Sequence, residues 1–207
     1  MAHTKLLTKW ISKNKATYLT SFPDKNIDLG RRIEIYKCLI EKELKGDAFD
    51  YLEFGVSKGR SFRWWTENIK NPDTRFYGFD TFTGLPEDWG HFKKGDMSSG
   101  DHPPVIEDSR HTFHQGIFQD TLVNFLKNHE LNRRLVIHLD ADLYSSTLFV
   151  LTTISPYLKA GDILIFDEFN VPMHEFKAFY EWSTSFYMQY ELLAEVNNYY
   201  QLAMKIK

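Results

Sequence analysis

The sequence predicts one α/β domain built on a doubly wound, mainly parallel sheet of seven strands that closes with a C-terminal antiparallel hairpin. From residue 49 onward, short apolar segments alternate with helical ones, which is typical of parallel strands joined by right-handed crossovers. The last two strand-like segments meet at Asn197-Asn198 without a helix between them, as in a hairpin. At 207 residues, the chain has room for one full core but little room for a second domain.

The first 45 residues are expected to form helices outside the sheet. An amphipathic helix is predicted at the start, because apolar residues repeat there at helical spacing: Leu6, Leu7, Trp10 and Ile11. It either covers a ligand site or packs on the body. Asp28 is placed to cap a second helix, which ends at Gly46-Asp47.

The remaining elements follow from apolar periodicity and turn residues. The predicted parallel strands span residues 49–54, 75–79, 111–118, 135–139 and 162–166. The predicted helices span residues 61–69, 120–128, 145–158 and 172–186, and the hairpin strands span 191–196 and 199–206. The segment 81–110 is far longer than the usual connection of about four to six residues. It is either a functional lid or partly disordered.

A glycine loop follows the first strand, within Tyr51–Phe62. Gly55 and Gly59 allow a sharp turn that lies close to a ligand, and the next helix points its free N–H groups at the loop. The spacing lacks the closer glycines of the dinucleotide fingerprint. Glu53 suits a ligand with hydroxyl or ammonium groups and would repel a pyrophosphate.

Acidic residues occur after all five predicted parallel strands. In an open parallel sheet, ligands bind beyond these carboxyl ends. The acids are Glu53, Asp80, Asp120, Asp140, Asp142, Asp167 and Glu168. Asp80 is expected to accept the hydroxyls of a ribose, and the alternative is a turn cap ahead of Thr81.

Asp140, Asp167 and Glu168 follow two neighbouring strands and are expected to converge. Three carboxylates in one cleft repel each other unless one is protonated or a cation binds. Oxygen ligands suit Mg²⁺, Mn²⁺ or Ca²⁺ rather than zinc. The alternative is a structural network in which a Lys or Arg, distant in sequence, pairs with these acids.

Five segments together resemble the successive motifs of the macrocin and mycinamicin O-methyltransferase family. They are Tyr51-Leu-Glu-Phe-Gly-Val-Ser-Lys-Gly-Arg-Ser61, Phe79-Asp-Thr-Phe-Thr-Gly-Leu-Pro-Glu87, Gly116-Ile-Phe-Gln-Asp-Thr-Leu122, Leu139-Asp-Ala-Asp-Leu-Tyr-Ser-Ser-Thr147 and Gly161-Asp-Ile-Leu-Ile-Phe-Asp-Glu168. The family comprises metal-dependent class I enzymes with a Rossmann-like fold, which methylate sugar hydroxyls of natural products. The resemblance runs from about residue 45 to the C-terminus.

The resemblance implies a site for S-adenosylmethionine and a site for Mg²⁺ or Mn²⁺. The implied cofactor residues are Glu53, Gly55, Ser57, Gly59, Ser61, Asp80, Thr81, Phe118 and Asp120. The implied metal ligands are Asp140, Asp167 and Glu168. The family usually has two aspartates where this chain has Asp167-Glu168. The N-terminal part, which supplies substrate and subunit contacts in the antibiotic enzymes, is shorter here.

The expected reaction is metal-dependent transfer of a methyl group to a hydroxyl of a sugar or other polyhydroxylated small molecule, with a glycoside as the expected acceptor. The base candidates are Asp140, His138 on the same side of its strand, and His174 at the start of the next helix. Either histidine has a packing or surface role as its alternative. Two other functions stay open: a nicotinamide-dependent oxidoreductase and a cofactor-binding protein without turnover.

Composition narrows the class of partner. The net charge is -3, and no run of five like charges occurs, so neither nucleic acid nor an anionic membrane is an expected partner. The single cysteine, Cys38, cannot form an internal disulfide, which suits a reducing cytosol. The chain shows no signal peptide or membrane span. We therefore expect a cytoplasmic protein, with a homo-oligomer possible.

Overall fold

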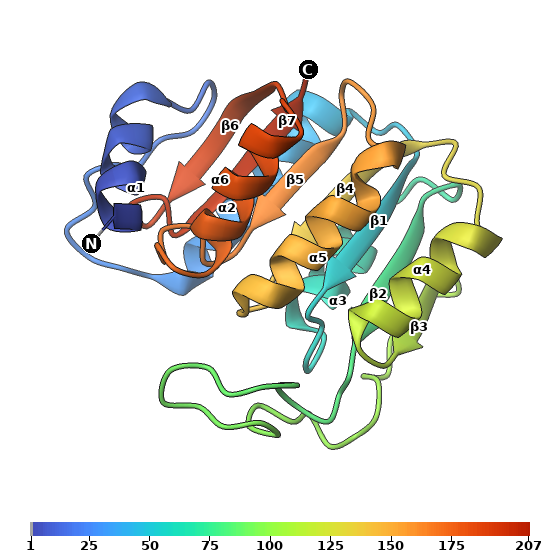
Figure 1. Cartoon of the computed structure of the whole chain (residues 1–207). Helices are drawn as coiled ribbons and strands as arrows, with labels where there is room; N and C mark the ends of the chain where they lie inside the picture. Colours follow the sequence, from blue (N-terminus) through green and yellow to red (C-terminus); the bar gives the residue numbers. More distant parts are fainter. Residues whose placement is uncertain (1) are drawn as a thin grey trace.

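The computed structural model describes residues 2–207 and contains one seven-stranded sheet (Figure 1). Its strands are β1 (Phe49–Phe54), β2 (Arg75–Asp80), β3 (His111–Gln115), β4 (Arg134–Leu139), β5 (Ile163–Phe166), β6 (Tyr190–Val196) and β7 (Gln201–Ile206). The strand order is β3-β2-β1-β4-β5-β7-β6. Strands β1 to β5 are parallel, and β7 is antiparallel to both of its neighbours. This arrangement confirms the predicted fold class.

Helices cover both faces of the sheet (Figure 1). The helical elements are α1 (Ala2–Lys13), η1 (Leu29–Arg31), α2 (Arg32–Leu39), η2 (Ile40–Leu44), α3 (Arg60–Asn68), α4 (Phe118–Asn128), α5 (Tyr144–Ile154), η3 (Ser155–Tyr157) and α6 (Glu175–Ser185). Helices α4, α5 and α6 share one apolar core with the sheet, whereas α2 and α3 share the other. Within residues 2–207, no helix combines the length and apolar character needed to cross a membrane.

The central strands are buried on both faces, as expected for a parallel sheet between two helical layers. Side chains alternate between the two cores along β1: Leu52 and Phe54 belong to the α4–α6 side, and Tyr51 belongs to the α2–α3 side. Glu53 and His138 are paired in register between β1 and β4, and both are fully buried. Buried polar side chains therefore enter the α2–α3 core near the carboxyl ends of these strands.

Helix α1 packs on the body of the domain, which is one of its two predicted roles. The Trp10 ring lies 4.8 Å from that of Phe169, and its indole N–H donates to the Tyr190 hydroxyl at 2.8 Å. Asp28 acts as predicted and caps the start of η1 by accepting the N–H of Gly30 at 2.9 Å. Helix α2 follows η1 directly, so this cap fixes where α2 begins.

The hairpin turn is longer than predicted. Strand β6 ends at Val196 and β7 begins at Gln201, so the turn has four residues rather than the predicted two. Asn197, Asn198 and Tyr199 all have positive φ. The longer turn is held by the carboxylate of Glu195, which accepts the N–H of Tyr199, and by contacts of both asparagines to the N-terminal segment. The sequence Asn197-Asn198 alone could not predict these long-range contacts.

Three element boundaries differ by three residues or more, and others differ by one or two. The predicted third strand ends at Gln115 rather than 118, because Gly116 has φ +141° and the chain then turns into α4. Helix α5 stops at Ile154 and continues as the short η3, which contains a proline. Helix α6 begins at Glu175 rather than at Pro172.

The segment 81–110 is a folded loop that lies beyond the carboxyl ends of the parallel strands (Figure 1). Leu85 exchanges backbone hydrogen bonds with Gly95 and Asp96 at 2.9 Å. The rings of Trp89 and Phe92 stack at 5.3 Å. The loop is therefore folded in this structure, and it lies close to the strand ends.

Candidate active site

The glycine loop joins the ends of β1 and β4. Gly55 has φ +95°, and a Cβ added there would lie 1.8 Å from the carbonyl oxygen of Asp140. The N–H of Asp140 donates to the carbonyl of Phe54 at 2.9 Å, so the two strand ends meet backbone to backbone. Glycine is required at position 55 by both the conformation and the contact.

Gly59 serves the other end of the loop, where α3 begins. It has φ +70°, and an added Cβ would lie 2.6 Å from the Cγ atom of Pro104. The long loop therefore packs directly on the glycine loop, and Gly59 permits that contact.

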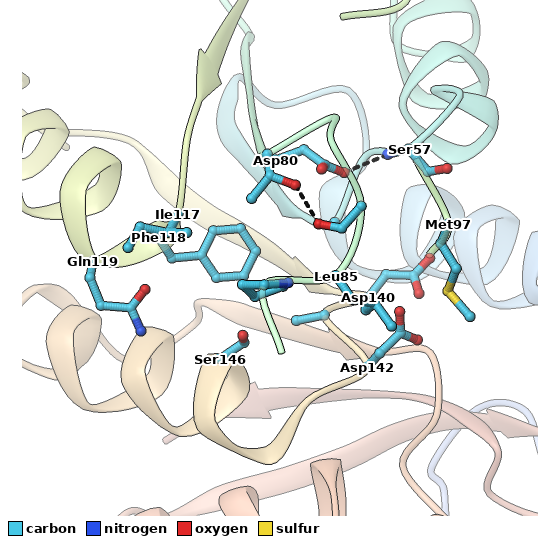
Figure 2. A pocket seen from close by; sticks show the side chains of 15 residues that line it. Ser57, Asp80, Leu85, Met97, Ile117, Phe118, Gln119, Asp140, Asp142 and Ser146 are labelled. Atoms are coloured by element: carbon cyan, nitrogen blue, oxygen red, sulfur yellow. Dashed lines mark hydrogen bonds between the residues drawn. The ribbon is translucent and has the colours of Figure 1, made fainter. Parts of the chain in front are cut away.

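A cavity of about 270 Å³ lies over the carboxyl ends of β1, β2 and β4 (Figure 2). It is lined by Gly55, Ser57, Asp80, Thr81, Gly84, Leu85, Pro86, Met97, Ile117, Phe118, Gln119, Asp140, Ala141, Asp142 and Ser146. Figure 2 shows Phe118 and Gln119 at one side, and the carboxylates of Asp140 and Asp142 beside Met97 at the other. The cavity thus has an aromatic side and an acidic side.

The structure divides the predicted cofactor residues into two groups. Those that line the cavity are Gly55, Ser57, Asp80, Thr81 and Phe118. Those outside its lining are Glu53, Gly59, Ser61 and Asp120. Asp120 is exposed in the first turn of α4, one residue beyond the part of the helix that faces the cavity. A helix turns by about 100° per residue, so Asp120 and Phe118 face different directions.

Asp80 shapes the cavity wall through three backbone hydrogen bonds. One carboxylate oxygen accepts the N–H groups of Val56 and Ser57 at 2.8 and 2.7 Å, and the other accepts that of Phe82 at 2.7 Å. Figure 2 shows the bond from Ser57. The bond to Phe82 is the turn cap that the sequence offered as the alternative role. Contact with a ribose stays a prediction, and the oxygen bonded to Phe82 has one lone pair left for a further donor.

Glu53 lies behind the glycine loop in a buried chain of hydrogen bonds. Its two carboxylate oxygens accept the hydroxyls of Ser61 at 2.7 Å and Tyr51 at 2.5 Å. The Tyr51 oxygen also lies 2.8 Å from Nδ1 of His138. Burial raises the pKa of Tyr51 well above its usual value, so the phenol keeps its proton.

These hydrogen bonds indicate which ring nitrogen of His138 carries the proton. Because the Tyr51 hydroxyl donates to Glu53, its oxygen accepts the Nδ1–H of His138. The lone pair is then on Nε2, which has no hydrogen-bond partner among residues 2–207. His138 therefore presents a buried acceptor or ligand atom.

His138 also lies close to two carboxylates. One ligand atom from each of His138, Asp140 and Asp167 lies within 4.8 Å of the others. Burial, and then the charge of Asp167, raise the pKa of Asp140 well above its usual value. Burial also raises the pKa of Asp167, to about 7. The two acids together need a positive charge nearby.

Arg32, the first residue of α2, supplies positive charge from outside the sheet. Its guanidinium nitrogens lie 2.9 Å from Oδ2 of Asp167 and 3.6 Å from Oδ2 of Asp140. This pairing realises the alternative in which a distant basic residue approaches the acids. The pairing leaves Oδ1 of Asp167 buried with no hydrogen-bond partner in the described chain.

Glu168 lies outside this group of three ligand atoms. Its carboxylate accepts the Tyr200 hydroxyl at 2.5 Å, and its N–H donates to the buried carboxylate of Glu175 at 2.9 Å. Burial raises the pKa of both glutamates. The structure therefore brings together Asp140 and Asp167 of the predicted metal ligands and adds His138 to them.

His174, the third base candidate, is at the N-terminus of α6. Its ring meets that of Trp89 edge to face at 5.8 Å, and burial lowers its pKa. It contacts the long loop and is outside the group formed by His138, Asp140 and Asp167.

Sequence reasoning gave no role to two residues of the site. Asp142 lines the cavity in a left-handed conformation, and burial raises its pKa to about 8. The position of Asp142 just after a predicted strand could have indicated that it belongs to the site. Arg32 gave no local signal, because more than a hundred residues separate it from the acids that it contacts.

Comparison with known proteins agrees with this geometry. The family model described as a methyltransferase domain matches residues 52–169, more than half of the chain. No curated protein matches the sequence. The matched segment contains the glycine loop, the cavity residues and the carboxylates.

Solved structures share the fold along nearly the whole chain. The calicheamicin methyltransferase CalS11 is 22% identical, with 99% of this chain and 91% of that chain covered and a TM-score of 0.63. The O-methyltransferase NovP is 18% identical, with 99% and 96% covered and a TM-score of 0.63. The structure titled cmcI-D160 Mg-SAM is 17% identical, with 94% and 90% covered and a TM-score of 0.56.

At these identities the solved structures establish the fold, and the family match establishes the class of protein. The match also decides against the nicotinamide-dependent alternative, in agreement with the glycine spacing and the closing hairpin. The chain belongs to the methyltransferase-domain family and has the class I, Rossmann-like methyltransferase fold that its motifs resemble.

Proposed function

We propose that the protein transfers a methyl group from S-adenosylmethionine to a hydroxyl of a sugar or similar polyhydroxylated small molecule, with the help of a divalent cation. The observation that carries this proposal is the position of Asp140. Its side chain both lines the cavity and belongs to the group with His138 and Asp167. A donor held in the cavity and an acceptor held at the acids would therefore meet at this residue.

The cavity fits the methyl donor in shape and charge. Phe118 offers an apolar face for the adenine, and Asp80 is within the lining for the ribose. Gly55 and Ser57 give the methionine part access to the loop backbone. The acidic side, with Asp140 and Asp142, suits the positive sulfonium. Glu53, Gly59 and Ser61 would act indirectly, by holding the glycine loop.

The acid group fits a divalent cation. The atoms available to hold it are carboxylate oxygens of Asp140 and Asp167 and the Nε2 atom of His138. Carboxylates suit Mg²⁺ and Mn²⁺, and imidazole is accepted more readily by Mn²⁺. Glu168 lies outside this group of ligand atoms, and one of its oxygens is bonded to the Tyr200 hydroxyl. When bound, the cation supplies orientation of the acceptor and lowers the pKa of its hydroxyl.

The chain supplies the remaining requirements of the reaction. Asp140 is the candidate base, since it lies between the cavity and the acid group and can take the hydroxyl proton. The carbon–sulfur bond of the donor breaks as the new carbon–oxygen bond forms, and alignment of these atoms is the main task of the site. His138 lies beside Asp140 and has an unpartnered ring nitrogen, Nε2.

The choice of acceptor would depend on the loop 81–110 and the N-terminal 45 residues. The loop contacts both helices that begin at the site: Glu87 accepts the Ser145 hydroxyl at 2.6 Å, and Trp89 meets His174. We propose that it is a lid over the donor. CalS11 is described as a TDP-rhamnose 3'-O-methyltransferase, so a glycoside or sugar nucleotide is the first acceptor to try.

The test is a mass-spectrometric screen of glycosides and sugar nucleotides for one added methyl group, with S-adenosylmethionine as donor. The expected product appears with Mg²⁺ or Mn²⁺, disappears with a chelator and returns when metal is added back. Full activity in chelator would remove the cation from the mechanism. Binding of S-adenosylhomocysteine, measured by calorimetry, tests the donor site separately from the acceptor.

Asp140→Ala distinguishes the enzyme from a cofactor-binding protein without turnover. We expect the variant to lose methyl transfer because both its base and a cation ligand are gone. A biological role that survives in this variant would instead support a binding protein.

A further inference from the structure

The guanidinium of Arg32 pairs with the same acids that are proposed to bind the cation. It contacts one oxygen of Asp167 and approaches one oxygen of Asp140, and it is three-quarters buried in doing so. Among residues 2–207, Arg32 is the one Lys or Arg that forms an ion pair with these acids. Its charge is permanent at any working pH.

The ion pair leaves a set of ligand atoms behind it. Nε2 of His138 and Oδ1 of Asp167 are buried without hydrogen-bond partners in the described chain. Both residues are more than nine-tenths buried. Arg32 therefore leaves two potential ligand atoms without a partner, and a cation could bind to them.

Arg32 is held firmly in this position. Its Nε–H donates to the carbonyl of Leu29 at 3.2 Å, which fixes the third side of the guanidinium. The backbone ahead of it is fixed by Asn197, whose side chain bonds both the N–H and the carbonyl of Asp28 at 3.0 and 2.8 Å. The four-residue hairpin turn thus sets the start of α2 and, with it, the position of the charge.

We propose that Arg32 is a positioning residue that weakens the binding of the divalent cation at His138, Asp140 and Asp167 and keeps it readily exchangeable. This inference rests on the proposed function. Two opposite effects arise from one side chain. The ion pair orients both carboxylates, which helps a cation to bind, but the guanidinium repels the cation at short range.

The repulsion is expected to be the larger of the two effects. Arg32 pairs with the same two carboxylates that would hold the cation, and most of its side chain is removed from solvent, so screening of the repulsion by salt would be weak. Orientation is partly preserved without Arg32, because Asp140 is fixed by the adjoining strand ends and His138 by Tyr51. Removal of the charge should therefore strengthen cation binding.

The test measures Mn²⁺ binding by electron paramagnetic resonance in chelator-treated protein. Arg32→Met should bind Mn²⁺ at least tenfold more tightly than the unchanged protein. Arg32→Lys, which keeps the charge, should stay within about threefold. Arg32→Gln keeps a donor for Asp167 and serves as a second neutral variant if the methionine variant does not fold. The matched control is Arg63→Met, since Arg63 contacts only the loop backbone at Val105.

Equal or weaker Mn²⁺ binding by both neutral variants would overturn the inference, as would tightening by Arg63→Met of the same size. Failure of every protein to bind millimolar Mn²⁺ would overturn it as well. Binding of S-adenosylhomocysteine, measured on the same samples, decides the donor part of the proposed function independently. Methyl transfer in the presence of chelator decides whether the reaction needs the cation at all.

Discussion

The two halves of the candidate site are built differently. The candidate donor cavity is lined by residues of the segments that follow β1, β2, β3 and β4. The acid group is formed by side chains from separate parts of the chain, namely Arg32, His138, Asp140 and Asp167. Local sequence therefore controls the donor cavity, whereas the acid group depends on how distant elements pack.

The halves also differ in charge balance. Asp80 in the donor half accepts three backbone N–H groups, which offset its charge without another ion. In the acid half, Asp167 is buried and Asp140 is partly buried, the two acids repel each other, and one arginine offsets them. We expect the acid half to respond to cations and the donor half to be indifferent to them.

The largest effect is expected where the two halves touch. Gly55→Ala would place a methyl group against the carbonyl of Asp140 and would strain a left-handed residue. We expect a loss of about 3 to 5 kcal/mol in the free energy of unfolding, because strain and overpacking add. Chemical denaturation measures this loss, and S-adenosylhomocysteine binding should disappear with it.

The matched control is Gly46→Ala. Gly46 also has positive φ, but an added Cβ there meets nothing within 4 Å. It should lose only about 1 kcal/mol, from backbone strain. Equal losses in the two variants would show that contact between the strand ends is unimportant.

Asp167→Asn should separate the two halves. It removes one cation ligand and the closer partner of Arg32, so we expect Mn²⁺ binding to weaken by about a hundredfold, or about 2.7 kcal/mol. Binding of S-adenosylhomocysteine, measured by calorimetry, should change by less than about threefold. If the two ligands weakened in parallel, the halves would not be independent.

Tyr51→Phe tests the buried hydrogen bonds behind the site. It leaves Glu53 short of a donor and Nδ1 of His138 without its partner, so a loss of about 1 to 3 kcal/mol in unfolding free energy is expected. The control is Tyr36→Phe, because the Tyr36 hydroxyl is buried without a hydrogen bond in the described structure. If Tyr36→Phe lost as much unfolding free energy as Tyr51→Phe, the hydrogen bonds of Tyr51 to Glu53 and His138 would not explain the loss.

Asp108→Asn should have the smallest effect and should touch neither half. Arg110, which bonds to Asp108, holds the pKa of this carboxyl below its usual value. The pair therefore stabilises the fold above the unfolded pKa of about 3.9, and this stabilisation is lost as the pH falls through the lower folded pKa. We expect a loss of about 0.5 to 1 kcal/mol at pH 7 that vanishes near pH 2. Thermal unfolding across pH measures it, and a loss that stayed constant with pH would contradict the ion pair.

The sheet could be predicted closely from the sequence. The range 49–54 matches β1, and the remaining strands were placed within a few residues of their bounds. Burial on both faces gives such strands continuous apolar runs that end at clear turns. The predicted length of the hairpin turn was wrong, because the turn depends on contacts of Asn197 and Asn198 with residues far away in sequence.

The sequence by itself determined the order of elements, the glycine loop and the acids at the strand ends, since these follow from local periodicity and from the fixed location of carboxyl ends in a parallel sheet. Only the tertiary structure decided which acids meet. In it, Glu168 accepts a hydrogen bond from Tyr200, and His138 lies beside Asp140 and Asp167. Arg32 forms ion pairs with both of these aspartates. Such choices depend on side-chain packing across distant segments, and the charge that each acid must balance arises only when those segments are buried together.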